Sequence, residues 1–100
     1  MIIIAQVVYP PESAKDMAER FLNAPAPPDY LTRKGGPYIG STIDDGIHTL
    51  SLWEVDESKL ADGLKFLGNY MAGFFGVPGF TYTFRVWFEA AEALPMIGMG

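Results

Sequence analysis

The segment Gly46–Asp56, with the sequence GIHTLSLWEVD, is the strongest strand signal in the chain. It alternates larger apolar residues with small or polar ones, and it holds the only histidine, His48, and one of the two tryptophans, Trp53. Asp56 at its end is a good helix N-cap. We therefore predict a strand that leads directly into a helix.

The tripeptide Asp44–Gly46 just before this strand predicts a hairpin turn, because aspartate and glycine tolerate the positive φ that such turns need. The partner is a weaker strand over Tyr38–Ile43. A two-residue turn would place Ile43 opposite His48 and make one face of the hairpin mainly aliphatic. A bulged three-residue turn would shift the register by one residue.

The remaining elements follow from apolar spacing and from prolines and glycines. They are a central strand over Ile2–Tyr9, a helix that begins near Pro11 and ends before Pro25, a surface loop over 23–37, a second helix over Glu57–Phe75 and a last strand over Phe80–Glu89.

This β-α-β-β-α-β order is the ferredoxin-like pattern, an α+β fold in which two helices cover one face of an antiparallel sheet with strand order 4-1-3-2. One hundred residues suit a single domain, 1–100. Residues 90–100 form an apolar C-terminal arm, since no charge follows Glu92.

The composition favours a homodimer. The chain is 49% hydrophobic and 14% aromatic but only 19% charged, against a usual charged content of about 25%. The first and last strands are apolar on both faces, so the sheet face away from the helices would expose apolar surface in a monomer. We expect sheet-on-sheet association, with the arm packed on the partner.

Charge and cysteine usage exclude several classes of function. The net charge is −5 and the basic residues are scattered, which argues against a nucleic-acid partner. The absence of cysteine excludes disulfides and thiolate metal sites, and it suits a cytoplasmic protein. The opening apolar run lacks a basic flank and is too short for a membrane span. One histidine is too few for a metal site, although Asp44 and Asp45 lie near it in sequence; we expect solvated turn carboxylates and no cofactor.

The motif TLSLWEVDESKL, residues 49–60, together with the element order over 1–89, resembles the dimeric α+β-barrel superfamily. That superfamily includes antibiotic-biosynthesis-type monooxygenases, haem-degrading monooxygenases and muconolactone-isomerase-like proteins. The resemblance implies a homodimer that binds a small molecule, with cofactor-independent monooxygenase or isomerase activity.

The haem-degrading branch carries an amide on the first strand, a tryptophan at the end of the third strand and an iron-ligating histidine on the second helix. Gln6 and Trp53 match the first two features. The segment Glu57–Phe75 has no histidine, which argues against haem binding.

His48 and Tyr70 are the candidate catalytic residues. His48 has an unperturbed pKa near neutrality and suits general acid–base chemistry; the alternative is a partly exposed histidine beside the hairpin. Tyr70 can donate a hydrogen bond from an apolar wall; the alternative is a core tyrosine bonded to a backbone carbonyl.

Five further side chains are candidates for ligand binding, because they are aromatic, or polar within apolar strands. They are Gln6, Trp53, Tyr82, Arg85 and Trp87. Core packing is the alternative for the aromatic residues, and an ion pair with Glu54 or Glu89 is the alternative for Arg85. A buried Gln6 would need a polar partner, which a ligand, a water or a backbone group would supply.

The sequence therefore favours a small dimeric protein that binds an apolar or aromatic molecule between its sheet and helices, in a pocket lined by Gln6, Trp53 and Tyr70. The competing hypothesis is a non-enzymatic ligand-sensing or protein-interaction module that dimerises through its sheet.

Overall fold

Strand β1 (Ile2–Tyr9) lies in the interior of a four-stranded sheet in the computed structural model, which describes residues 1–100. Its two edges pair with β3 (Gly46–Val55) and β4 (Thr81–Trp87), and β2 (Leu31–Thr42) pairs with the far edge of β3. All pairs are antiparallel, and the order β2-β3-β1-β4 reads 4-1-3-2 from the β4 edge. The α+β class and the central position of β1 are confirmed.

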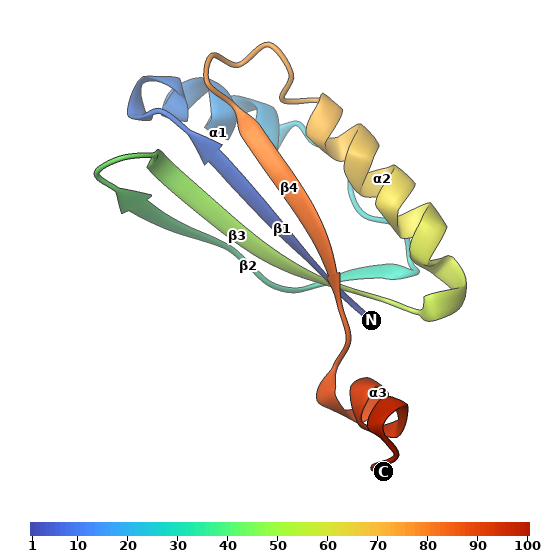
Figure 1. The fold of residues 1–100 in the computed structure, drawn as a ribbon. Helices are drawn as coiled ribbons and strands as arrows, with labels where there is room; N and C mark the ends of the chain where they lie inside the picture. The colour runs from blue at the N-terminus through green and yellow to red at the C-terminus, as the bar shows by residue number, and fades with distance from the viewer.

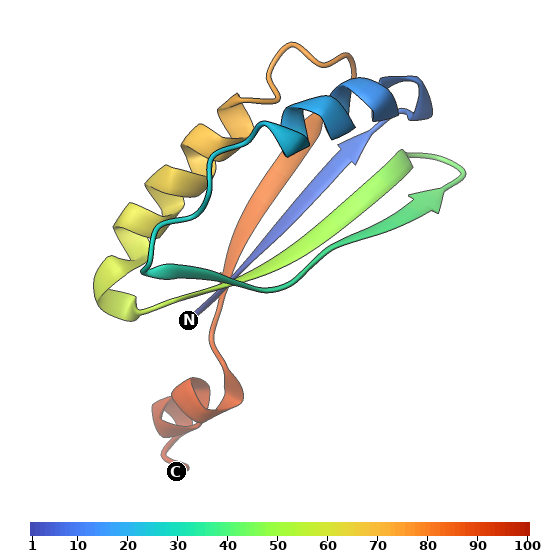
Figure 2. The same cartoon turned by 180° about the vertical axis from the view of Figure 1, so that it is seen from behind.

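Two helices, α1 (Ala14–Leu22) and α2 (Leu60–Ala72), lie on the same face of the sheet, as Figure 2 shows. Short 3-10 turns over Pro11–Ser13 and Glu57–Lys59 lead into them. Asp56 is the N-cap as predicted, and its side chain accepts a hydrogen bond from the backbone N–H of Ser58 at 3.4 Å.

The core lies between this helix-covered face and the helices. In β1 the odd-numbered side chains point into it, because alternate strand residues face opposite sides of a sheet. Trp53, only 2% exposed, lies opposite Ile3 across the β1–β3 pair. From α2 the fully buried Leu67 joins them. The buried apolar residues are Ile3, Ala5, Val7, Tyr9, Met17, Leu31, Trp53, Val55, Leu67, Tyr70, Met71, Phe74 and Val77.

The expected surface loop over 23–37 is wrong in its second half, because β2 begins at Leu31. The pairing of β2 with β3 continues through the glycines and Pro37 by means of two register shifts, between Arg33 and Gly35 and between Gly35 and Tyr38. Gly36 has φ +87°, and a Cβ there would collide with the carbonyl oxygen of Leu50. Glycine is therefore needed for this strand to stay paired.

The predicted hairpin register is also wrong. Thr42 pairs with Gly46 and Gly40 pairs with His48, so Ile43 does not lie opposite His48. Ile43 is instead fully exposed in the turn, between the paired ends of the two strands. The turn comprises residues 43–45, so His48 pairs with Gly40 rather than with Ile43, a shift of three residues; both irregularities of β2 lie further from the turn and do not contribute to it. As a result, Ile39 lies opposite Thr49, and the aliphatic residues are divided between the two faces.

The chain beyond β4 leaves the body of the protein, as Figure 1 shows. It forms a short helix, α3 (Ala90–Ala93), and a 3-10 turn over Leu94–Ile97. Glu89 and Glu92 cap α3 reciprocally. The arm leaves its large apolar side chains exposed, namely Leu94, Met96, Ile97 and Met99. None of the helices has both the length and the hydropathy that a bilayer crossing requires.

Candidate functional site

A cavity of about 160 Å³ lies between the helix-covered face of β1, β2 and β3 and the two helices. Its walls are mainly apolar and aromatic. The lining residues are Ala5, Val7, Tyr9, Met17, Ala18, Phe21, Arg33, Pro37, Ile39, Thr49, Ser51, Trp53, Tyr70, Met71 and Phe74.

The walls differ in how far they are buried. Trp53 and Met71 are almost completely buried and lie on the inner side of the cavity. Phe21 of α1 is 38% exposed and Ile39 of β2 is 70% exposed. The cavity therefore opens to solvent along the line between α1 and β2.

Arg33 is the only charged side chain that lines the cavity. Its guanidinium lies over the ring of Trp53, with Cζ 4.4 Å from the ring centroid, and 5.6 Å from the centroid of Phe21. The register of β2 explains this position, because Arg33 is paired with Trp53 immediately before the first irregularity. Residues opposite each other on paired strands place their side chains on the same face.

The guanidinium of Arg33 is incompletely satisfied. One terminal nitrogen, Nη2, lies 3.5 Å from the hydroxyl of Tyr70, which is a long contact. The Nε atom is buried and has no hydrogen-bond partner. Arg33 takes part in none of the ion pairs of the chain, so no carboxylate neutralises it.

The side chain of Tyr70 lies between the guanidinium of Arg33 and the aromatic residues that line the cavity. Its ring meets Trp53 edge-on at a centroid distance of 6.3 Å, and it also contacts Phe66 and Phe74 at 6.2 and 5.6 Å.

Tyr9, at the C-terminal end of β1, also lines the cavity, and burial raises the pKa of its hydroxyl above the usual value. The polar side chains that line the cavity are the hydroxyls of Tyr9, Thr49, Ser51 and Tyr70 and the guanidinium of Arg33.

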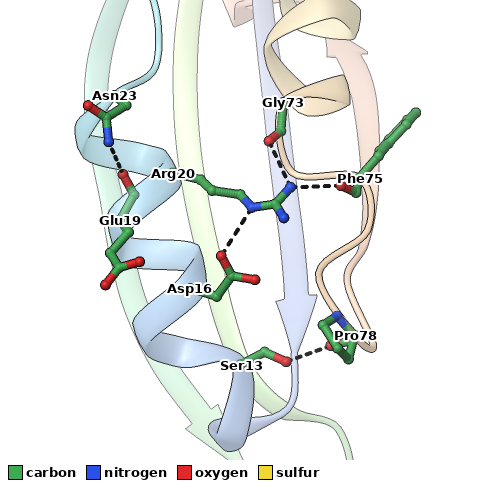
Figure 3. Close-up of polar contacts among 8 residues, drawn as sticks. All are labelled: Ser13, Asp16, Glu19, Arg20, Asn23, Gly73, Phe75 and Pro78. Carbon is green, nitrogen blue, oxygen red and sulfur yellow. Dashed lines mark hydrogen bonds and ion pairs between the residues drawn. The ribbon is translucent and has the colours of Figure 1, made fainter.

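Three hydrogen bonds, from Arg20 and Ser13, hold α1 and the turn before it against the segment that follows α2, as Figure 3 shows. Nη1 of Arg20 donates to the carbonyls of Gly73 and Phe75 at 3.2 and 2.7 Å, while its Nε contacts Asp16 at 3.1 Å. The hydroxyl of Ser13 donates to the carbonyl of Pro78 at 2.7 Å. The accepting carbonyls all lie in the segment after α2, so these bonds join α1 to the chain that leaves α2.

The structure brings together only two of the residues selected from sequence, Trp53 and Tyr70. Tyr82 also points to the helix-covered face but lies further along the sheet, where it stacks on Phe80 and Phe75 at centroid distances of 5.6 and 6.1 Å; these two rings also contact each other. It is 39% exposed and does not line the cavity.

Gln6 lies on the opposite face, so the expectation that it shares a pocket with Trp53 and Tyr70 is wrong. It is paired with Leu50 and Thr83 and is exposed. The reason is its position in β1: even-numbered residues of this strand point away from the helices.

His48, Arg85 and Trp87 also lie on the face away from the helices, paired with Val8, Ile4 and Ile2 of β1. His48 Nε2 is 3.7 Å from an oxygen of Asp45 and 3.5 Å from the hydroxyl of Thr42, which places it in the hairpin region.

Arg85 lies over Trp87, with Cζ 5.9 Å from the ring centroid. It forms no ion pair with Glu54 or Glu89; Glu54 pairs instead with Lys34 at 3.6 Å.

Sequence reasoning missed Arg33 because it fell within the predicted loop. It also missed the α1 residues Met17 and Phe21 as parts of a ligand site. No local signal could have identified Arg33, because its place beside Trp53 depends on the register of β2 against β3.

The side chains of the cavity suit a small organic molecule. No group of three or more His, Cys, Asp or Glu side chains is close enough together to hold a metal ion. The chain matches no protein-family model, and no curated protein sequence is significantly similar to it.

Proposed function

We propose that this protein binds a small apolar or aromatic molecule in the cavity between its sheet and helices. The supporting observation is a preformed space of about 160 Å³ with aromatic walls and a few convergent polar groups, which is the usual composition of a ligand site. An apolar cavity of about 150 Å³ is large enough for benzene, so a single aromatic ring fits.

We include in the proposal a ferredoxin-like layout and a homodimer. The two copies would associate through the sheet face away from the helices, here called the open face. The element order and sheet order support the layout. The open face carries apolar side chains of the two central strands between its polar residues: Ile2, Ile4, Val8, Leu50 and Leu52. A second copy on this face would remove that surface from water, and the exposed apolar arm beyond Glu89 would extend the contact.

Any cofactor-independent monooxygenase or isomerase chemistry in the cavity would use Tyr70. Its hydroxyl lies 3.5 Å from Nη2 of Arg33 and belongs to a residue that lines the cavity, so it can donate a hydrogen bond to a bound molecule. His48 lies on the other face and cannot reach a molecule bound beside Trp53.

A non-enzymatic sensing or interaction module is the second candidate. The observation that favours it is the separation of His48, Arg85 and Trp87 from the cavity, on the face where a partner would bind. In that case ligand binding would be retained, but no substrate would be converted.

Binding is tested with fluorobenzene, a neutral ring-sized probe, followed by ¹⁹F NMR. Ser51 lines the cavity and is 9% exposed, so Ser51→Leu should fill the space and abolish saturable binding. Thr83→Leu makes the same kind of change in the neighbouring part of the sheet but on the open face, and should leave binding intact. Absence of binding to the unmodified protein, or equal binding to both variants, would contradict the proposal.

A further inference from the structure

We infer that the molecule bound in the cavity carries an anionic group, of which a carboxylate is the simplest, and that Arg33 receives it. This inference rests on the proposed function, because it assigns the chemical class of the ligand. The observation behind it is an arginine that lines an otherwise uncharged, apolar cavity.

The protein itself supplies no counter-charge. Arg33 has no carboxylate within ion-pair distance, although the chain carries twelve Asp and Glu residues. Its buried Nε lacks any hydrogen-bond partner. A cation held away from water without a counter-charge is unfavourable, and an anion bound in the cavity at the terminal nitrogens of Arg33 would supply that counter-charge.

The aromatic contacts orient the guanidinium for such a partner. The guanidinium lies over the ring of Trp53, with Cζ 4.4 Å from the ring centroid, so the indole blocks an approach from that side. The N–H groups of a guanidinium point outward in its plane, so an anion approaches along these edges. Two N–H groups of an arginine match the two oxygens of a carboxylate, which makes this approach favourable.

Tyr70 provides a second donor at the same point. Its hydroxyl lies 3.5 Å from Nη2 of Arg33, a distance that leaves both groups free to turn toward a third partner. Beyond this polar point, Met17, Phe74 and Trp53 enclose apolar space. The site therefore fits a compact ring or short hydrocarbon that ends in a carboxylate.

A matched pair of probes separates charge from shape. The probes are 4-fluorobenzoate and 4-fluorobenzamide, which have the same ring and nearly the same size but differ in charge at neutral pH. A hydrogen bond to a charged group contributes enough to make the benzoate bind about tenfold more tightly than the benzamide, measured by ¹⁹F NMR titration.

Two variants test whether the preference for 4-fluorobenzoate over 4-fluorobenzamide arises at Arg33. Arg33→Met removes the charge and keeps an unbranched side chain on Trp53, so it should bind both probes equally. Arg85→Met removes the other arginine that lies over a tryptophan, on the opposite face, and should keep the tenfold preference. Arg33→Gln is the second variant if Arg33→Met does not fold, and the same loss of preference is expected.

The outcomes distinguish this inference from the proposed function. If both probes bind the unmodified protein equally, or if the preference survives in the Arg33 variants, the inference is wrong but the cavity is still a ligand site. If the preference disappears in Arg85→Met, the anion binds on the open face and the inference is wrong. If neither probe binds, nor fluorobenzene, the proposed function itself is wrong.

Discussion

Replacing Arg33 with methionine should make the protein more stable in the absence of ligand. In the native structure the Nε of Arg33 is buried without a partner, and such a group costs about 1–3 kcal/mol relative to a satisfied one. Methionine removes this cost and fills much of the same space. A residue that serves a ligand rather than the fold is expected to behave in this way.

The interactions that would be lost are weaker. The contact of the guanidinium with the ring of Trp53 contributes about 0.5–2 kcal/mol. A methionine sulfur on the same ring recovers about 0.3–1.5 kcal/mol of this. The 3.5 Å contact with Tyr70 is too long to contribute much. The free energy of unfolding should therefore rise by about 1 kcal/mol, which corresponds to about 4–8 °C in Tm for a chain of this size.

The assay is urea denaturation followed by circular dichroism, with Lys65→Met as the control. Lys65 is exposed on α2 and forms no ion pair, so its replacement should change stability by no more than about 0.5 kcal/mol. If Arg33→Met lowers the free energy of unfolding by 1 kcal/mol or more in a measurement where Lys65→Met does not, Arg33 is a structural residue and the reasoning fails.

Three further predictions concern the core, the α2 cap and the arm. Leu67→Ala should lower the free energy of unfolding by about 2–5 kcal/mol in the same assay, because Leu67 is fully buried; a loss below 1 kcal/mol would contradict the packing described. The hydroxyl of Ser58 and its N–H lower the pKa of Asp56, so the ionised carboxylate stabilises the fold above about pH 4 and this contribution is lost as pH falls through the lowered folded-state value. Asp56→Asn should accordingly flatten the acid side of a stability–pH profile, whereas parallel profiles would exclude a role for this charge. Deletion of residues 90–100 should shift native mass spectra from twice the protomer mass toward the monomer, and a full-length monomer would argue against the dimer.

The elements with a regular apolar period could be predicted from sequence. β1, β3, α2 and β4 each carry one unbroken pattern, and Leu67 and Met71 occupy the buried stripe of α2 as expected, with Phe74 buried just beyond the end of the helix. The second half of β2 lies within the predicted strand Tyr38–Ile43, but its first half could not be predicted, because Gly35, Gly36 and Pro37 are local turn signals that pairing with β3 overrides. That pairing is a long-range contact which leaves no local trace.

Long-range strand pairing also decides which residues of the candidate site could be predicted from sequence. Trp53 was selected because it is large and ends a strand, and it does line the cavity. Gln6 was selected as a polar residue in an apolar strand, but only the register with β3 shows which face of β1 meets the helices. Arg33 could not be identified from sequence, because its role depends on the first half of β2, which the sequence does not predict.

The most direct test of the ligand site uses the methionine methyl groups. Met17 and Met71 line the cavity, whereas Met96 and Met99 lie exposed in the C-terminal arm. The protein labelled with ¹³C at the methionine methyls is titrated with 4-fluorobenzoate and followed by NMR. The resonances of Met17 and Met71 should shift in saturable fashion while those of Met96 and Met99 stay unchanged. Shifts confined to the arm, or no shift at any methionine, would contradict binding between the sheet and the helices.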